Sequence, residues 1–344
     1  MPEIRPFRAL RYGDAAGPLA DLVAPPYDVI SPAERERYRA RSRYNVVRLT
    51  LPDSEEQAAR DLGDWRRAGV LVEEAEPAVW WVAQDYVGPD AVARTREGLA
   101  ASLRVEPYET GAVLPHERTH AGPKEGRLRL LRATRTQLEP IFLLYDAEPP
   151  VARPDGPPDL EAEEGGVATR LWRIPEAEPR LDVPLLIADG HHRYETAVAF
   201  SQEDPGATHM LAVLVSARAP GLVVFPTHRL VRNLGDVPAT PLPDLPEPLP
   251  GPVLYRDGGY ALIETDEEVD AEAVAGLDAE VVGYAPVAAE AVAAVDRGEA
   301  DAAFLLRPVG VEQIAARAAA GGVMPQKTTF FYPKLLSGML FHPV

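Results

Sequence analysis

The chain has 344 residues and no cysteine, with 46% hydrophobic and 26% charged residues. This composition is typical of a folded protein, and the lack of cysteine excludes disulfides, thiolate catalysis and thiolate metal sites. The formal net charge of −18 disfavours a nucleic-acid partner, because a phosphate-binding face must be basic. The first residues do not resemble a signal peptide and the apolar runs are too short for a membrane helix, so we expect a cytoplasmic protein without a membrane partner.

The N-terminal part has a mixed α/β pattern. Residues 46–51 have strand character, and residues 54–69 are predicted to form a helix with Ser54 as its N-cap. Residues 78–82 (AVWWV) are a short strand candidate. The next predicted elements are a basic helix, a buried strand and a loose, proline-rich acidic connection, at residues 127–136, 141–145 and 149–166.

The second half continues this alternation of short apolar strands with helices. Strands are predicted at residues 183–188, 210–216, 222–225, 260–264 and 302–306. Helices are predicted at residues 194–200, 285–294 and 311–320, and residues 238–252 form a proline-rich linker. The pattern indicates an α/β or α+β protein, with mixed sheets favoured over a doubly wound parallel sheet.

The clearest functional signal lies in residues 185–197 (LLIADGHHRYETA), where a strand runs through an Asp-Gly turn directly into a helix. Glycine lets the backbone approach a ligand, and the free N–H groups and dipole at a helix start favour an anion. Histidine and arginine add donors at the same end, and arginine can bind phosphate through two parallel hydrogen bonds. We predict a phosphate or oxyanion site, with a purely structural turn as the alternative. The candidate ligands are Asp189, Gly190, His191, His192 and Arg193.

Residues 116–120 (HERTH) match the His-Glu-x-x-His pattern of zinc proteases. That chemistry needs a continuous helix, and we expect Gly122 and Pro123 to end any helix just after His120. We therefore disfavour a zinc hydrolase and assign no metal ligands. The preferred interpretation makes Glu117 a general base for a substrate hydroxyl, flanked by His116 and His120. An exposed charged turn is the alternative.

Other segments supply further candidates for ligand contacts. Lys124 follows the histidine-rich segment and can add a mobile cation. Residues 321–334 (GGVMPQKTTFFYPK) place a lysine before two hydroxyls, which suits polyphosphate oxygens. The candidates there are Lys327, Thr328 and Thr329, with Lys334 as a weaker one. Weak substrate-binding candidates are Tyr27 and Asp28 in APPYDVI (24–30) and His228 in PTHR (226–229), although turn structure alone explains these segments equally well.

Together these segments resemble a bacterial and archaeal family long described as a domain of unknown function, number one thousand and fifteen. The matching stretches are residues 24–30, 116–120, 140–145, 188–197, 226–231 and 324–340. The central part of that family is similar to free-serine kinases with a ParB/sulfiredoxin-like fold. Those kinases carry a Pro-His-Glu loop, an Asp-Gly-His-His-Arg turn and a Pro-x-Lys-Thr-Thr segment in this order.

The resemblance implies phosphoryl transfer to the hydroxyl of free L-serine, giving O-phosphoserine for cysteine synthesis. It makes Glu117 the base, residues 189–193 the phosphate cradle and residues 327–329 a closing phosphate loop. The donor is expected to be ATP, ADP or pyrophosphate, with Mg²⁺. A non-catalytic nucleotide-binding regulatory protein is the other interpretation.

The same resemblance suggests three regions. Residues 1–105 form an N-terminal α/β region, residues 106–236 a ParB/sulfiredoxin-like catalytic core, and residues 237–344 a C-terminal α/β region with the closing loop. The sequence does not predict the oligomeric state.

Overall fold

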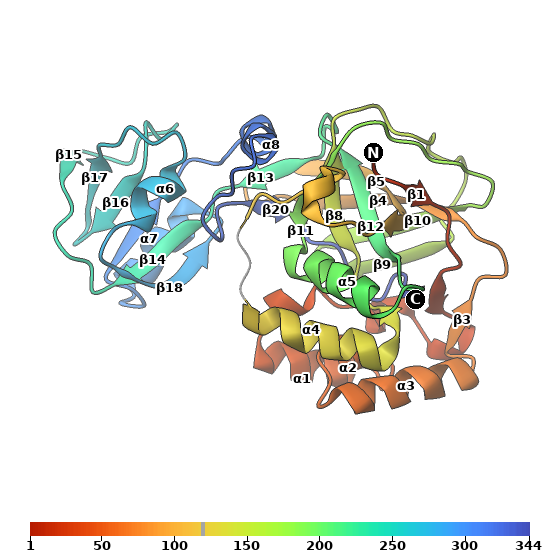
Figure 1. The fold of residues 1–344 in the computed structure, drawn as a ribbon. Helices are drawn as coiled ribbons and strands as arrows, with labels where there is room; N and C mark the ends of the chain where they lie inside the picture. The colour runs from red at the N-terminus through yellow and green to blue at the C-terminus, as the bar shows by residue number, and fades with distance from the viewer. Residues whose placement is uncertain (118–120) are drawn as a thin grey trace.

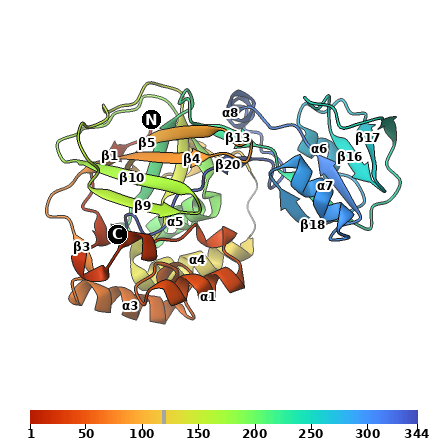
Figure 2. The same cartoon turned by 180° about the vertical axis from the view of Figure 1, so that it is seen from behind.

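The computed structural model describes residues 1–117 and 121–344, except for the side chains of residues 121–123. Among these residues the chain forms a larger part around a nine-stranded mixed sheet and a smaller part around a six-stranded antiparallel sheet (Figures 1 and 2). The mixed α/β class expected from the sequence is confirmed. No helix in the described ranges is long and apolar enough to cross a membrane.

The large sheet has central strands that are buried along their whole length, which explains their continuous apolar runs. In spatial order its strands are β6 (Val113–Leu114), β11 (Leu185–Asp189), β8 (Ile141–Tyr145), β12 (His209–Ser216), β5 (Ala93–Arg104), β4 (Val79–Val87), β10 (Val167–Ile174) and β9 (Leu160–Glu164), and β1 (Ile4–Arg5) pairs with β5. Strand β8 runs parallel to β12 and antiparallel to β11.

Helix α5 (His191–Glu203) lies against one face of this sheet, and the other helices of the larger part gather below the sheet in the views of Figures 1 and 2. Helix α5 contacts β8 and β12, α4 (Ala121–Thr134) packs on α5, and α3 (Glu55–Arg67) packs on α4. Helices α1 (Pro32–Arg41) and α2 (Val47–Thr50) complete the group.

The smaller part contains its own sheet and helices. Its strands, in spatial order, are β15 (Ala239–Leu242), β17 (Gly259–Ile263), β16 (Val253–Arg256), β19 (Ala302–Leu305), β14 (His228–Arg232) and β18 (Glu280–Ala285). Its helices are α6 (Asp270–Ala275), α7 (Ala288–Asp296) and α8 (Val311–Ala319). Three two-stranded pairs complete the fold: β2 (Leu10–Tyr12) with β3 (Leu71–Glu73), β13 (Val223–Phe225) with β20 (Phe330–Tyr332), and β7 (Thr136–Gln137) with β21 (His342–Pro343).

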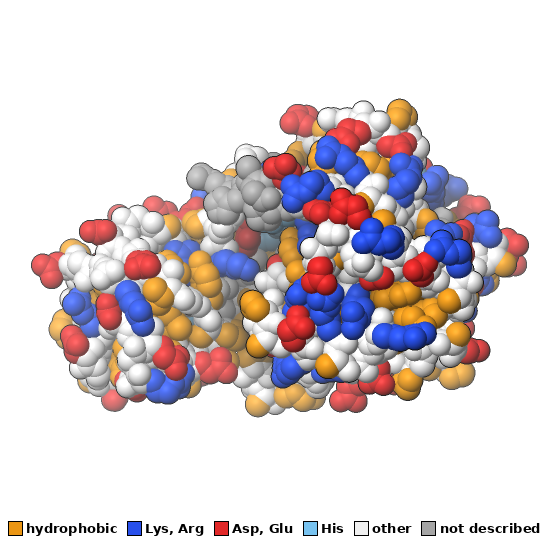
Figure 3. All heavy atoms as spheres, turned by 90° about the horizontal axis from the view of Figure 1, so that it is seen from below, with side chains coloured by type: hydrophobic (Ala, Val, Ile, Leu, Met, Phe, Trp, Pro, Cys, Tyr) orange, Lys and Arg blue, Asp and Glu red, His pale blue; other side chains and the backbone are white. Residues whose placement is uncertain are grey.

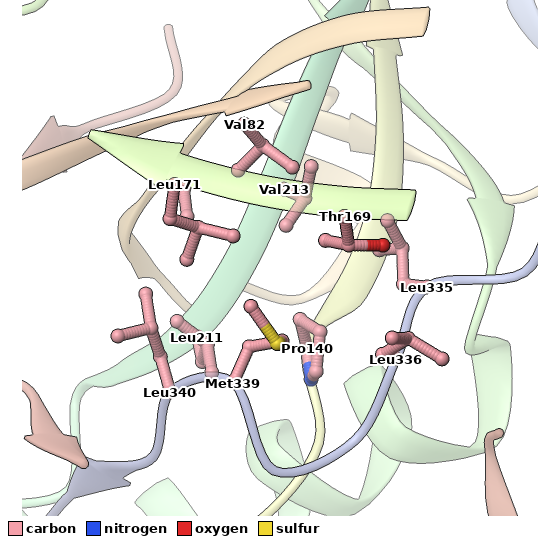
Figure 4. Close-up of a pocket in the computed structure, with 11 residues that line it drawn as sticks. Val82, Pro140, Thr169, Leu171, Leu211, Val213, Leu335, Leu336, Met339 and Leu340 are labelled. Atoms are coloured by element: carbon pink, nitrogen blue, oxygen red, sulfur yellow. The ribbon is translucent and has the colours of Figure 1, made fainter. Parts of the chain in front are cut away.

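After α8 the chain returns to the larger part, and this returning segment, residues 321–344, is the C-terminal tail. Its side chains cover the sheet face opposite α5: in Figure 4, Leu335, Leu336, Met339 and Leu340 lie against residues of β10 and β12. The gap left there has a volume of about 30 Å³, and its lining is almost entirely apolar.

Two local predictions have opposite outcomes. The helix predicted at residues 54–69 is confirmed as α3, and the Ser54 hydroxyl accepts a hydrogen bond from the Gln57 N–H, 3.2 Å away. The strand predicted at residues 46–51 is wrong, because residues 47–50 form α2. The Asn45 side chain accepts from the Val47 N–H (3.0 Å) and donates to two carbonyls of the preceding loop. These tertiary bonds override the β propensity of the valines.

Other boundaries also shift. The described part of helix α4 starts at Ala121 and contains Gly122 and Pro123, so the expectation that these two residues end a helix is wrong. The expected loose connection at 149–166 contains β9, and the expected linker at 238–252 contains β15. The predicted boundary at residue 105 lies just after β5. Strand β5 pairs with β12, which belongs to the predicted region 106–236, so one sheet extends across this boundary. The three-region division stays a prediction.

The turn between β11 and α5 depends on a glycine. Gly190 has φ = +98°, and a Cβ there would lie 2.8 Å from a methyl carbon of Ile141. The turn therefore requires both a left-handed backbone and the absence of a side chain.

We predict that Gly190→Ala lowers the free energy of unfolding more than Gly156→Ala. Gly156 has a similar φ of +92° but no neighbouring heavy atom within 4 Å of a built Cβ. The control should cost about 1–2 kcal/mol for the backbone conformation alone, and Gly190→Ala about 1–3 kcal/mol more for overpacking. Urea denaturation measures both. Equal losses would show that the contact with Ile141 does not constrain the turn.

Candidate functional site

A polar pocket of about 240 Å³ lies where the carboxyl end of β11 meets the start of α5. Its walls come from four segments that are far apart in sequence. The lining residues are Tyr27, Asp28, Glu117, Ala188, Asp189, Gly190, His191, His192, Arg193, Gln326, Lys327, Thr329 and Lys334. The predicted cradle, the predicted base and the predicted lysine therefore border one pocket.

Asp189 is the buried anchor of this pocket. Its carboxylate accepts a hydrogen bond from Arg193 Nη2, 2.6 Å away, and a second from the Lys334 ammonium. Burial raises the pKa of the Asp189 carboxyl, but the charges of Lys334 and Arg193 outweigh burial and hold the pKa well below its usual range. Asp189 is therefore an ionised carboxylate that holds two cations in place.

The guanidinium of Arg193 is engaged within the protein. Besides Asp189, it donates to the carbonyl of Pro140, and the side chain is 9% exposed. The two-pronged phosphate contact expected for Arg193 would have to replace these bonds. In the structure Arg193 instead fixes the position of Asp189, and its role as a phosphate ligand stays a prediction.

His191 begins helix α5 and is buried beside His116. Its Nε2 accepts a hydrogen bond from the backbone N–H of His116, 3.3 Å away. Burial and the neighbouring His116 lower the pKa of His191 to about 3. His191 is consequently neutral at pH 7, with its proton on Nδ1.

Glu117 is brought to the pocket by pairing between its own segment and the C-terminal tail. The two segments form a parallel bridge between Glu117 and Met324. Glu117 Oε1 accepts a hydrogen bond from the Thr329 hydroxyl, 3.1 Å away, and lies 3.6 Å from His116 Nε2. Burial raises the pKa of the Glu117 carboxyl, but the interactions with His116 and with the Thr329 hydroxyl outweigh burial and lower the pKa to about 2. Glu117 is therefore ionised at neutral pH.

His116 is fully buried, and both of its ring nitrogens have close partners. Nδ1 lies 2.6 Å from the carbonyl oxygen of Ile187, and Nε2 lies 3.0 Å from the Thr329 hydroxyl. Since a carbonyl only accepts, Nδ1 carries a proton and donates it to Ile187. His116 thus links β11 to the C-terminal tail.

Two of the three residues of the predicted closing loop, 327–329, line the pocket. Lys327 and Thr329 line the pocket, whereas the buried hydroxyl of Thr328 donates to the Pro325 carbonyl, 2.6 Å away. Thr328 therefore shapes the turn, and its predicted contact with phosphate is not supported. Lys334, the weaker sequence candidate, lines the pocket through its bond to Asp189. Gln326 also lines the pocket but was not assigned from the sequence, although it lies in the same motif.

The N-terminal candidates Tyr27 and Asp28 also line the pocket. The Tyr27 N–H donates to Glu139, 3.0 Å away, and the guanidinium of Arg127 lies 3.8 Å from the centre of the Tyr27 ring. These contacts hold the APPYDVI segment against α4. The segment therefore borders the pocket, and the role of Tyr27 and Asp28 in substrate binding stays a prediction.

The remaining candidates are not in this pocket. Lys124 is ion-paired with Glu195, and neither residue lines it. His228 accepts a hydrogen bond from the Leu306 N–H (3.0 Å) and borders a separate cleft between the two parts of the molecule. Its predicted place beside the substrate is therefore not supported. His120 lies outside the described residues.

At His116 and Glu117 the structure differs from the continuous helix that the zinc-protease pattern needs. Both residues precede helix α4, and Glu117 pairs with the tail instead of forming a helical turn. Within residues 1–117 and 121–344 there is no group of three or more His, Asp or Glu side chains placed to hold a metal ion. The helical arrangement of the zinc-protease motif is not formed by these two residues.

The basic residues of and just after α4 have acidic neighbours. Arg129 pairs with Glu55 (2.9 Å), and Arg132 and Arg135 pair with acidic residues at the end of α5, each at 2.6 Å. On the face seen in Figure 3, Lys and Arg side chains are interspersed with Asp and Glu. The basic sequence of this helix thus does not make it a separate anion-binding surface.

Comparison with known proteins places this chain in a family. The family model described as "Protein of unknown function (DUF1015)" matches residues 4–247. No protein with a curated description matches the chain. Three solved structures are similar over most of their length, at low identity.

A free serine kinase in complex with AMP is 18% identical, with a TM-score of 0.40, over 64% of this chain and 83% of that chain. SbnI from Staphylococcus aureus, with a C-terminal truncation, is 12% identical, with a TM-score of 0.41, over 68% and 85%. A conserved hypothetical protein from Pyrococcus furiosus is 16% identical, with a TM-score of 0.37, over 64% and 87%. The family model covers well over half of the sequence, and the chain therefore belongs to the DUF1015 family of proteins of unknown function.

Proposed function

We propose that this protein is a small-molecule kinase that transfers a phosphoryl group to a substrate hydroxyl in the pocket between β11 and α5. The observation that carries the proposal is that the ionised carboxylate of Glu117 borders the same pocket as the start of α5 and Lys327. Phosphoryl transfer requires mainly positioned positive groups and a base beside the acceptor, with little covalent chemistry from the protein.

The three cationic side chains that line the pocket differ in their partners. Arg193 and Lys334 are both held by Asp189. Lys327 also lines the pocket, and it makes no ion pair with the residues that the structure describes. Together with the N–H groups at the start of α5, Lys327 is the natural contact for an incoming phosphate.

The resemblance of the sequence motifs to those of free-serine kinases suggests the acceptor and the donor. The Pro-His-Glu, Asp-Gly-His-His-Arg and Pro-x-Lys-Thr-Thr segments all reach this pocket, which supports a ParB/sulfiredoxin-like core and free L-serine as the acceptor. ATP, ADP or pyrophosphate would be the donor. Mg²⁺ usually binds through one or two carboxylates and substrate phosphates, and Asp28 at the exposed edge of the pocket is a carboxylate suited to that role.

We predict that Glu117→Gln lowers the rate of phosphoserine formation by about 10²–10⁴, the usual contribution of a general base. Phosphorus NMR with L-serine, Mg²⁺ and each donor in turn measures the product. Glu178→Gln, which changes an exposed carboxylate on another surface, is the matched control.

Two results would contradict this assignment in different ways. No phosphoserine from the wild-type protein with any donor would remove serine as the acceptor. Nucleotide binding without turnover, unaffected by Glu117→Gln, would instead fit the non-catalytic regulatory protein.

We also predict that Lys327→Met weakens donor binding about 10- to 100-fold, because a charge-assisted hydrogen bond contributes about 1.5–3 kcal/mol. Titration calorimetry with ADP and Mg²⁺ measures the dissociation constant. Lys124→Met is the control, since it removes a lysine that is paired with Glu195 outside the pocket. Equal affinities for Lys327→Met and the wild type would place the phosphates elsewhere.

A further inference from the structure

The hydroxyl of Thr329 lies between the proposed base and a buried histidine. Thr329 Oγ1 is 3.1 Å from Glu117 Oε1 and 3.0 Å from His116 Nε2. The direct distance between Glu117 Oε1 and His116 Nε2 is 3.6 Å, too long for a hydrogen bond. The hydroxyl is therefore the hydrogen-bonded link between the carboxylate and the imidazole.

The hydrogen-bonded series of Glu117, Thr329 and His116 has two protonation states. A hydroxyl donates one proton, and His116 Nδ1 is already committed as a donor to the Ile187 carbonyl. With His116 neutral, Thr329 donates to Nε2, and Glu117 keeps an acceptor position that a substrate hydroxyl can fill. With His116 protonated, Nε2 donates to Thr329 and Thr329 donates to Glu117, so every group in the chain is satisfied.

We propose that Glu117, Thr329 and His116 form a proton relay in which His116 stores the proton removed from the substrate hydroxyl. The relay rests on the proposed phosphoryl transfer and gives Thr329 a role other than phosphate binding. Glu117 is the group that touches the substrate, whereas Thr329 and His116 act through it.

The step balances as follows. The acceptor O–H bond breaks and its proton moves to Glu117, while the acceptor oxygen bonds to phosphorus. The bond from phosphorus to the donor's leaving oxygen breaks, and its electron pair stays on that oxygen. The Glu117 proton passes to Thr329 Oγ1 as the Thr329 proton passes to His116 Nε2. The proton returns along the same chain to water after the products leave.

Glu117 and His191 are titratable groups that face the His116 ring. The negative charge of Glu117 is the feature that favours a stored proton at this fully buried position. His191 already uses Nε2 to accept the His116 N–H, so its accepting nitrogen is occupied. Ile187 from β11 and Phe331 from β20 contribute no charge.

The relay also returns Glu117 to its active form. The pKa of the Glu117 carboxyl is held low, so the group that accepts the substrate proton is a carboxylate. Passing the proton on to Thr329 and His116 restores that carboxylate within the pocket.

The test compares Thr329→Val, which removes the hydroxyl at nearly constant shape, with Thr329→Ser, which keeps it. The nitrogen NMR signals of His116, assigned by their loss in His116→Gln, report its proton affinity without any activity assay. We expect Thr329→Val and Glu117→Gln each to lower the apparent pKa of His116 by one unit or more, and Thr329→Ser to restore the wild-type titration. Thr329→Val should still unfold cooperatively, at a lower temperature because two buried groups lose a hydrogen-bond partner. The His116 titration, which a purely structural role would not move, separates the relay from a structural role.

The kinetic arm uses the pH dependence of kcat/KM. In the wild type the acidic limb should follow the His116 titration. In Thr329→Val the rate should fall at least tenfold, and the limb should move to lower pH. A His116 titration that is unchanged in both Thr329→Val and Glu117→Gln overturns the relay. If the variants shift the His116 titration but the wild-type protein transfers no phosphoryl group, the hydrogen-bonded link is supported and the proposed function is overturned.

Discussion

The buried carboxylate of Asp189 is the constraint on which the site depends. A buried charge costs several kcal/mol unless it is paired, and removing a partner typically costs about 3–5 kcal/mol. Here one partner, Arg193, lies four residues along on α5, and the other, Lys334, comes from the C-terminal tail. Gln84 and Arg96, both buried, donate to backbone carbonyls of the same tail, at 3.2 and 2.6 Å. Asp189 is therefore fully satisfied only when the tail has returned to the large sheet.

This pairing also sets the electrostatics of the pocket. Asp189 neutralises part of the charge of Arg193 and Lys334, so neither acts as a free cation toward a phosphate. Counting only carboxylates, lysines and arginine, the lining contains three negative and three positive side chains. A polyphosphate would therefore be attracted by local geometry, through helix N–H groups and Lys327, and not by a large net positive charge. Binding in such a pocket depends on the exact positions of these groups, and the hydrogen bonds and ion pairs among its buried side chains hold them there.

The sequence predicted what local rules determine. Ser54 caps α3 because its hydroxyl reaches an N–H three residues away, and Gly190 marks a turn that excludes a side chain. The motifs around Glu117 and Lys327 indicated the right segments for one pocket. The features that could not be predicted depend on partners far away in the sequence. Residues 47–50 form α2 instead of the predicted strand because Asn45 binds carbonyls more than twenty residues away. The guanidinium of Arg193 donates to the Pro140 carbonyl, which no local pattern indicates.

The adjacency of His116 and Glu117 in the sequence has a similar long-range explanation. In an extended segment, neighbouring side chains point to opposite sides of the backbone, so two adjacent residues do not readily share a direct hydrogen bond. A third group must connect them, and Thr329 of the tail supplies it. The same returning segment thus completes both the ion pair at Asp189 and the hydrogen-bonded chain at Glu117. The base and the cradle are assembled by one event, the docking of residues 324–340 on the large sheet, and this couples the chemistry of the pocket to the completion of the fold.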